Sequence, residues 1–464
     1  MKAADPSCAA RDAGSGRGMR SEWPVSRGVW RKQWASSSEA VIDGCGLATS
    51  QFQVVGVPLW GDGLRPLRAE RSGHPQDARV TVEDSLLVRS VGRSSRGVGG
   101  RSRLNTLTGL RALAALAVFA VHMQARLSGD PAHAFAYISN AGGMGVTFFF
   151  ALSGFILTWS YRSGDTAAPF WRRRFARIYP AYLVALLGGV LLTVASHGRD
   201  GVSAVQSYDR LRDLVGPFLA QLTLTQSWVP DEKYYFSLNG VGWSLSCEAF
   251  FYACFPALIV ALVHASTRVR RLVQAGSFAV LVAAALAVEL DAFPHAGWLQ
   301  GHAPILTAFQ FVLGITVALD VRDGKWSRLN FRWTLLVVAA MYVMCCIWPS
   351  TFSMSAVPVL PFLALIAAGC WRDQRNEGGL LSGRVFVWLG EVSFCFYLVH
   401  QMVIRCLGVL GGAASWNGAV VQTLVALTLS LLAAWLLHVL VEKPFERRLR
   451  GTNRAKPPQT VQAG

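Results

Sequence analysis

From about residue 104 onward, the sequence is a succession of apolar runs separated by short polar segments. The runs are about 17–25 residues long, the length at which an α-helix crosses the hydrocarbon core of a bilayer. Within lipid, only helices and closed barrels satisfy their own backbone hydrogen bonds, and uniformly apolar runs of this length are typical of helices. The pattern therefore predicts an all-α, polytopic membrane bundle.

Charge supports this class and argues against a nucleic-acid partner. Hydrophobic residues make up 52% of the chain and charged residues 15%, against about 25% charged residues in soluble domains. The formal net charge is +17, but within the apolar part the basic residues fall between the runs, where they orient membrane proteins. We expect the partner to be the lipid bilayer and not nucleic acid.

Ten runs are expected to span the membrane, with both termini cytoplasmic. An eleventh apolar segment, 213–228, is short and contains Gly216 and Pro217. If it does not span, basic segments such as 264–271 fall inside, as the positive-inside rule requires. We therefore expect 213–228 to be re-entrant or interfacial on the outer face. The ten expected spans are 107–127, 143–161, 177–196, 243–263, 272–290, 303–320, 333–349, 355–371, 386–408 and 417–441.

The two ends of the chain differ from its centre. Residues 1–103 are rich in Gly, Ser and Arg and lack the apolar core of a signal peptide. They are typical of a disordered basic tail, and a start codon assigned too far upstream is an equal alternative. Residues 104–450 are expected to form the transmembrane domain, and residues 451–464 a short cytoplasmic tail.

The nine cysteines predict neither a disulfide framework nor a metal site. No two have the two-residue gap of redox and zinc motifs. Most lie in or beside apolar runs, where cysteine behaves as a small hydrophobic residue.

The first run, LTGLRALAALAVFAVHM (107–123), contains one arginine and one histidine. From Arg111 to His122 a helix makes three turns plus about 20°, so both side chains project from one face, about 16 Å apart. With the N-terminus inside, Arg111 lies near the cytoplasmic mouth and His122 in the outer half. Ionisable groups inside a membrane usually face a cavity, although Arg111 alone would suit a helix-end anchor. The spacing suits a long ligand with an anionic head and a reactive tail.

Two further segments add charged side chains. WRRRFAR (171–177) places Arg174 and Arg177 at the inner mouth, where they either bind phosphate or anchor the topology. In GVGWSLSCEAFFY, Glu248 lies about as far from the outer surface as His122 does, so the two side chains could meet. A carboxylate there would fix the tautomer of the imidazole, and a structural hydrogen bond between helices is the alternative.

A polar stripe follows near the C-terminus, in LGEVSFCFYLVH (389–400). Ser393, Tyr397 and His400 share one helical face, which predicts that they line a cavity. His400 is a candidate second base or substrate contact, with interhelical hydrogen bonding as the alternative. Tyr397 and Trp243 are further candidate substrate contacts. Glu442, in the closing EKPF, is expected to pair with the arginines of the inner mouth.

These stretches together resemble the integral membrane acyltransferase 3 family. The first run has that family's basic residue, ten-residue gap and histidine. FFFALSGFILTW followed by RRRFARIYPAY is similar to its second signature. GVGWSLSCEAFFY, LGEVSFCFYLVH and the closing EKPF are similar to its later motifs. The resemblance covers residues 104–450, and all of the motifs occur in order.

The resemblance implies that an acyl group, usually acetyl, passes from cytoplasmic acyl-CoA to a hydroxyl of a carbohydrate or glycolipid. It implies that Arg111 and His122 are the family's essential pair, with His122 as general base, and that Glu248 is its acid. Arg174 and Arg177 would then contact the nucleotide of CoA. Acetyl-CoA is the expected co-substrate, with no metal, and the expected location is the cytoplasmic (inner) membrane of a bacterium.

The sequence departs from many members of the family in one respect, and one other interpretation competes with an acyltransferase. Many members append a C-terminal hydrolase-like domain, whereas only residues 442–464 follow the last expected span here. Transfer is therefore expected to finish within the membrane domain or to pass to a separate outer-face transferase.

The competing interpretation is a transporter of a glycan or small metabolite, which would also bury His and Glu but would not bind CoA. We find no internal repeat of the kind that many transporters contain.

Overall fold

A computed structural model describes residues 103–196, 211–408 and 411–449. All of them belong to the second of two compact units, Gly92–Gly464. The predicted tails, up to residue 102 and from residue 451, lie outside the described residues. The described residues are helical and contain no β-strand, so the predicted all-α class is confirmed.

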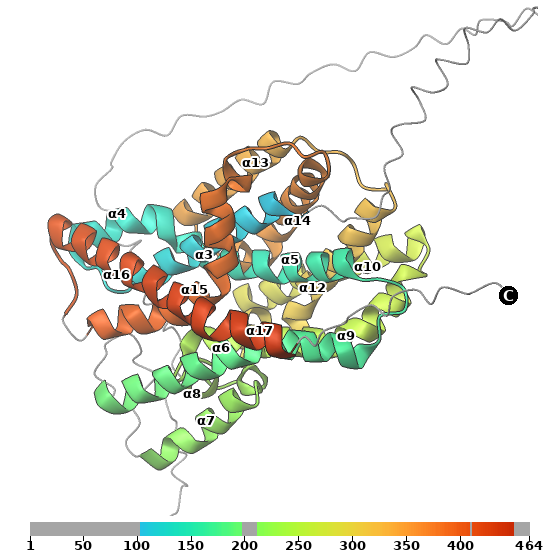
Figure 1. Ribbon diagram of the computed structural model, residues 1–464. Helices are drawn as coiled ribbons and strands as arrows, with labels where there is room; N and C mark the ends of the chain where they lie inside the picture. The colour runs from blue at the N-terminus through green and yellow to red at the C-terminus, as the bar shows by residue number, and fades with distance from the viewer. Residues whose placement is uncertain (1–102, 197–210, 409–410, 450–464) are drawn as a thin grey trace, which may run out of the picture. The chain divides into compact units, whose positions relative to one another are not determined.

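Nine helices of the described residues are long and apolar enough to cross a bilayer, and a tenth, α13, is apolar but has only 17 residues. A helix of 17 residues rises about 26 Å, which is at the lower limit for a span. The predicted polytopic bundle is therefore confirmed, and α13 has the same 17 residues as the expected span 333–349, displaced by two positions. The ten helices that correspond to the expected spans (Figure 1) are α3 (Asn105–Gln124), α5 (Met144–Ser160), α6 (Ala167–Ser196), α9 (Trp243–Val263), α10 (Thr267–Glu289), α12 (Pro304–Arg322), α13 (Phe331–Ile347), α14 (Phe352–Gln374), α15 (Arg384–Gly408) and α16 (Trp416–Leu437).

The segment 213–228 does not form a spanning helix. It contains α7, whose eight residues rise about 12 Å. The hydroxyls of Tyr179 and Tyr182 on α6 donate to the carbonyls of Leu222 and Gln221, at 2.9 and 2.8 Å, and so attach α7 to the bundle. The shorter elements are α4 (Gly129–Ser139), η2 (Asn140–Gly143), η4 (Leu211–Leu214), α7 (Val215–Leu222), η5 (Gln226–Trp228), α8 (Glu232–Tyr235), η6 (Gly240–Gly242), α11 (Ala296–Gly301), η7 (Leu380–Ser382), the π-helix η8 (His438–Glu442) and α17 (Lys443–Leu449).

The arginine-rich segment 171–177 is helical, because α6 begins at Ala167 and not near residue 177 as expected. The expected span began at residue 177 because charged residues precede it, yet arginine is a good helix former and the helix extends through them. Arg174 and Arg177 are three residues apart and so share a face. Both are partly buried, whereas Arg172 is exposed. The helix therefore turns Arg174 and Arg177 toward the bundle and Arg172 away from it.

Close backbone contacts position the helices that carry the candidate site. A Cβ atom at Gly154 on α5 would meet the carbonyl of Phe311 on α12, and one at Gly390 on α15 would meet the carbonyl of Thr108 on α3. Small residues allow this kind of approach between membrane helices. The contact at Gly390 brings α15 against α3 (Figure 1), and these two helices carry the candidate histidines.

The N-terminus of α3 is capped by a side chain from another helix. Asp373 on α14 accepts hydrogen bonds from the backbone N–H of Thr106, at 2.9 and 3.0 Å, and from the Thr106 hydroxyl, at 2.6 Å. It also accepts from the N–H of Leu107 at 3.4 Å. The first N–H groups of a helix have no partner within the helix and carry its positive dipole end. Asp373 therefore fixes where α3 begins, and with it the positions of Arg111 and His122.

Candidate active site

His122 and His400 meet at the interface of α3 and α15. His400 Nε2 lies 3.1 Å from His122 Nδ1, and the ring centroids are 5.0 Å apart. His122 Nδ1 also lies 2.9 Å from the carbonyl oxygen of Val118, and His400 Nδ1 lies 3.1 Å from that of Phe396. The sequence placed both histidines among the candidate site residues, and the structure joins them directly.

The surroundings of the two imidazoles are aromatic. His400 is fully buried, and the ring of Phe396 stacks on it at an interplanar angle of 16°. Phe119 and Tyr397 add tilted rings at 6.3 and 5.8 Å. His122 is partly buried near the last turn of α3. Neutral imidazoles suit such an apolar environment, because burying a charge without a charged partner is costly.

Arg111, at the other end of α3, lies in a charged cluster. It interacts electrostatically with Arg177, Glu248 and Glu442, and Glu248 interacts in turn with Arg174 and Arg177. These interacting groups are three guanidinium groups and two carboxylates, which leaves one positive charge in excess when all are in their usual ionisation states. The structure brings together the arginines that the sequence assigned to the inner mouth. We call these five residues the arginine–glutamate cluster.

Glu248 belongs to this cluster and not to the histidine pair. Its carboxylate accepts a hydrogen bond from Tyr252, one turn along α9, at 3.2 Å. Among the described residues, the hydrogen bonds of His122 are to His400 and Val118. The expected meeting of Glu248 and His122 is therefore not observed. Counting residues from the helix ends gave equal depths, but it could not show which side of the bundle each helix faces.

Glu442 is held by two residues that the sequence analysis missed. His438 Nδ1 donates to Glu442 Oε2 at 2.6 Å, and the Cys395 thiol donates to the same oxygen at 3.1 Å. The expected pairing with the inner-mouth arginines is present as an electrostatic interaction with Arg177. The four-residue spacing from His438 to Glu442, at the end of the last apolar run, was the available signal.

Cys395, His438 and Glu442 also form the kind of group that could hold a metal ion, with one ligand atom of each within 4.8 Å of the others. Their separations of 2.6 and 3.1 Å from the shared carboxylate oxygen are ordinary hydrogen-bond distances. Hydrogen bonding and the nearby Arg177 account for the arrangement. The absence of a metal stays a prediction.

Tyr397 packs beside His400, whereas Trp243 packs against a different histidine, His302. The Tyr397 hydroxyl lies 2.9 Å from Ser244 Oγ and donates to the carbonyl of Val241 at 3.2 Å. Trp243 packs edge-on against His302, with 4.5 Å between ring centroids. His302 was not predicted, because it lies at an expected span boundary. The hydroxyl of Tyr397 is thus occupied, and only its ring faces His400.

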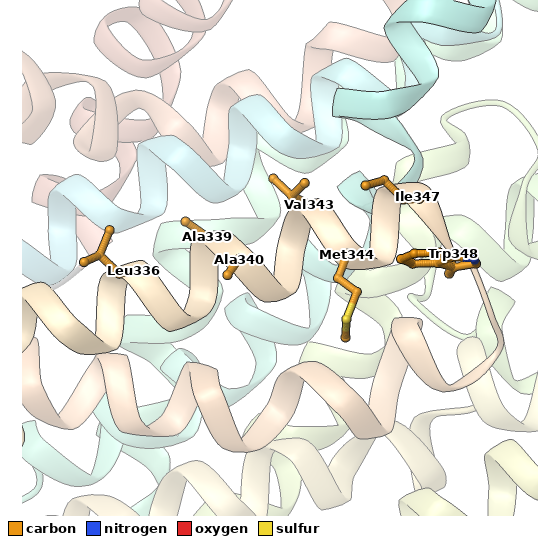
Figure 2. A pocket seen from close by; sticks show the side chains of 7 residues that line it. All are labelled: Leu336, Ala339, Ala340, Val343, Met344, Ile347 and Trp348. Carbon is orange, nitrogen blue, oxygen red and sulfur yellow. The ribbon is translucent and has the colours of Figure 1, made fainter. Parts of the chain in front are cut away.

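A separate groove lies along α13, far in sequence from these groups. It has a volume of about 500 Å³, and Figure 2 shows seven side chains along α13 and the turn that follows it. None of the seven is titratable, and Trp348 is 72% exposed. The groove has the composition of a lipid-facing surface and offers no group for chemistry. Its lining residues are Leu336, Ala339, Ala340, Val343, Met344, Ile347 and Trp348.

Comparison with known proteins identifies the family. The model of the acyltransferase 3 family, described as an acyltransferase domain, matches residues 104–439. The chain belongs to this family. It is 36% identical over 387 residues to the acyltransferase MdmB of Streptomyces mycarofaciens, an alignment that covers 78% of this chain and 97% of that protein. No solved structure matches.

Other members of the acyltransferase 3 family are more distant. Nodulation protein 10 of Rhizobium leguminosarum is 26% identical, over 65% of this chain and 81% of that protein. The peptidoglycan O-acetyltransferase OatA of Listeria monocytogenes is 29% identical over 34% of this chain and only 25% of that protein. The family and the apolar helices make this chain a multi-pass membrane acyltransferase, so the transporter interpretation loses its support.

Within this family, the two ends of α3 offer different chemistry. A neutral imidazole can accept a proton from a hydroxyl at near-neutral pH. Guanidinium groups bind phosphates through paired, charge-assisted hydrogen bonds. An acyl transfer between a phosphate-bearing donor and a hydroxyl acceptor needs both functions, at a distance set by the length of the donor.

Proposed function

We propose that this protein transfers an acyl group, in particular acetyl, from cytoplasmic acyl-CoA to a hydroxyl of a cell-surface or lipid-linked carbohydrate. The observation that carries the proposal is family membership combined with the histidine pair on α3 and α15. The names of two relatives support an acetyl group and a glycan, since they are a peptidoglycan O-acetyltransferase and an O-acetyl transferase of Shigella phage Sf6. The proposed location is the cytoplasmic membrane of a bacterium.

The arginine–glutamate cluster is the proposed site for the CoA nucleotide. Its excess positive charge favours a polyanion, and Arg111, Arg174 and Arg177 supply donors for phosphate oxygens. Glu248 and Glu442 reduce the cost of burying three guanidinium groups while the site is empty. A donor held here would have to extend about 16 Å along α3 to bring its thioester to His122.

His122 is the proposed general base. Its imidazole accepts the proton of the acceptor hydroxyl while the hydroxyl oxygen attacks the carbonyl carbon of the thioester. The carbon–sulfur bond breaks as the ester bond forms, and the departing CoA thiolate takes a proton, so that the products are an ester and CoA thiol. Trp243 and the ring of Tyr397 are the proposed neighbours of the acceptor. If the acceptor lies beyond reach, a separate outer-face transferase would complete the transfer.

Purified protein in detergent or lipid nanodiscs tests this function with radiolabelled acetyl-CoA. We expect CoA to bind and the labelled acetyl group to pass slowly to water, which gives acetate, or to a soluble sugar acceptor, which gives an acetyl ester. Mass spectrometry of cell-surface glycans with and without the protein should show the loss of an acetyl-sized substituent. Unchanged glycans together with no CoA binding would contradict the proposal. The matched control is His122→Ala, which should bind CoA and transfer nothing.

A further inference from the structure

The hydrogen bonds of the histidine pair determine which ring nitrogens carry protons. A carbonyl oxygen only accepts, so His400 Nδ1, at 3.1 Å from the Phe396 carbonyl, carries its hydrogen in that bond. In the neutral ring the other nitrogen, His400 Nε2, then has a lone pair. This lone pair faces His122 Nδ1 at 3.1 Å.

The same reasoning fixes the proton of His122. Its Nδ1 lies 2.9 Å from the Val118 carbonyl and 3.1 Å from His400 Nε2. Both of these neighbours are acceptors, so Nδ1 carries the hydrogen and shares it between them. Nε2 of the neutral His122 ring therefore has the lone pair. The two carbonyls and the contact between the rings leave one consistent arrangement of protons.

We infer that His400 is a positioning residue, which holds His122 in the tautomer with its proton on Nδ1 so that Nε2 is the base. This inference rests on the proposed function, and it departs from the expected roles of His400 as second base or substrate contact. It assigns to a neutral imidazole the orienting task that the sequence analysis gave to Glu248. A base oriented by a third group is a common arrangement in acyl transfer.

The pair also stabilises the charge that forms during the reaction. When His122 Nε2 takes the proton of the acceptor hydroxyl, the ring becomes an imidazolium that keeps its proton on Nδ1. The Nδ1–H of this imidazolium donates a hydrogen bond to the lone pair of His400 Nε2. This bond stabilises the positive charge in a site that is otherwise aromatic. When Nε2 gives its proton to the CoA thiolate, both rings return to their starting state. His400 neither gains nor loses a proton.

The packing around His400 prevents it from turning away. Phe396 stacks on one face of its ring, and Phe119 and Tyr397 pack around it. The Tyr397 hydroxyl is engaged by Ser244 and Val241, so it does not compete for the lone pair of His400. Among the described residues, the two imidazoles hydrogen-bond to each other and to the backbone of their own helices.

Two substitutions of His400 separate this role from the alternatives. His400→Gln places an amide oxygen near the position of Nε2 and so retains an acceptor, whereas His400→Phe keeps a ring of similar size without one. We expect His400→Phe to lower kcat by about 100-fold or more while leaving the KM for acetyl-CoA unchanged. His400→Gln should retain kcat within about tenfold of the wild type. His400→Phe with wild-type kcat would overturn the inference.

Nitrogen-15 NMR of histidine-labelled protein measures the tautomer without any substrate. Difference spectra against His122→Ala identify the His122 signals. We expect one tautomer, protonated on Nδ1, in the wild type and in His400→Gln, and a mixture in His400→Phe. The same single tautomer in His400→Phe would overturn the inference, as would a His400→Gln variant that keeps this tautomer but transfers nothing. The wild type could transfer no acetyl group while the His122 tautomer still differs between the wild type and His400→Phe. In that case the proposed function fails and the positioning role of His400 stands.

Discussion

The two ends of α3 show how differently one membrane helix can carry polar groups. At one end, Arg111 lies among two more arginines and two glutamates. At the other end, His122 faces a second imidazole that aromatic rings surround. In the first environment, carboxylates offset most of the charge of the guanidinium groups. In the second, the imidazoles are neutral and their neighbours are uncharged. Their difference supports the proposal that donor binding and proton transfer are separated along the helix.

Each environment suits its proposed task for a physical reason. Buried guanidinium groups remain charged at all working pH values and so offer a fixed attraction for phosphate. An imidazole that must take up a proton has to be neutral at rest. Nearby cations would repel the imidazolium that forms and so make the imidazole a weaker base. About 16 Å of helix keeps the arginines away from the base.

The largest expected effect lies at the histidine end. His122→Gln keeps a polar side chain of similar length that cannot act as a base, and His122→Ala removes the polar side chain altogether. Because general-base catalysis contributes about 100- to 10,000-fold, both variants should lose that much of kcat while the Kd for acetyl-CoA stays at the wild-type value. Acetyl transfer and CoA binding are measured on the same purified protein. If His122→Gln transfers acetyl at near the wild-type rate, the imidazole is not the base.

The next effect is expected at the arginine end. Charge-assisted hydrogen bonds contribute about 1.5–3 kcal/mol each, so Arg174→Ala with Arg177→Ala should weaken CoA binding at least about tenfold, and kcat at saturating donor should change less. Calorimetry or filter binding at low and high salt gives the Kd. The matched control is Arg172→Ala on the same helix, which is exposed and should leave binding unchanged. Normal binding with lost turnover would assign these arginines another task.

Glu248 provides a further test of the difference between the two ends of α3. The sequence predicted it beside His122, whereas the structure places it with the arginines. If it oriented His122, Glu248→Gln would lower kcat by about 100-fold or more. Its interactions with three arginines predict instead a decrease in kcat of less than about tenfold and a change in the affinity for CoA. Steady-state kinetics with varied acetyl-CoA separates the two results. A large loss of kcat at unchanged affinity would return Glu248 to the histidines.

The smallest effect is expected at the N-terminus of α3. Asp373→Ala leaves the N–H groups of Thr106 and Leu107 without their acceptor, which should cost about 0.5–2 kcal/mol of stability. Thermal unfolding should shift downward by a few degrees. Asp373→Asn retains one acceptor oxygen and should lose less. Equal stability of both variants and the wild type would show that the cap does not fix this end of the helix.

The sequence predicted the helices better than it predicted contacts between them. Apolar run length located the spans, and the short α7 agreed with the loop charges. Motif order placed His122, His400 and the arginines among the candidate site residues. Spacing along one helix could show that Arg111 and His122 share a face, but the rotation of α9 against α3 depends on glycine contacts and packing. The partner of Glu248 therefore needed a three-dimensional structure.

His438 and Cys395 were missed for a related reason. Each is a single polar or weakly polar residue in an apolar run, where a structural role is the ordinary expectation. The bond from Cys395 to Glu442 depends on the approach of α15 to η8, whereas the bond from His438 lies within η8 and had only its four-residue spacing as a signal. The tautomer of His122 likewise depends on two carbonyls and a second ring, which no sequence pattern reveals.

The separation of tasks along α3 is tested most directly by acetyl-CoA binding and single-turnover acetyl transfer in purified His122→Gln, measured in one preparation beside the wild type. The separation predicts a Kd for acetyl-CoA within about twofold of the wild-type value, because the arginine–glutamate cluster is intact, and a rate lowered by about 100-fold or more. Loss of CoA binding in His122→Gln, or transfer at the wild-type rate, would contradict it.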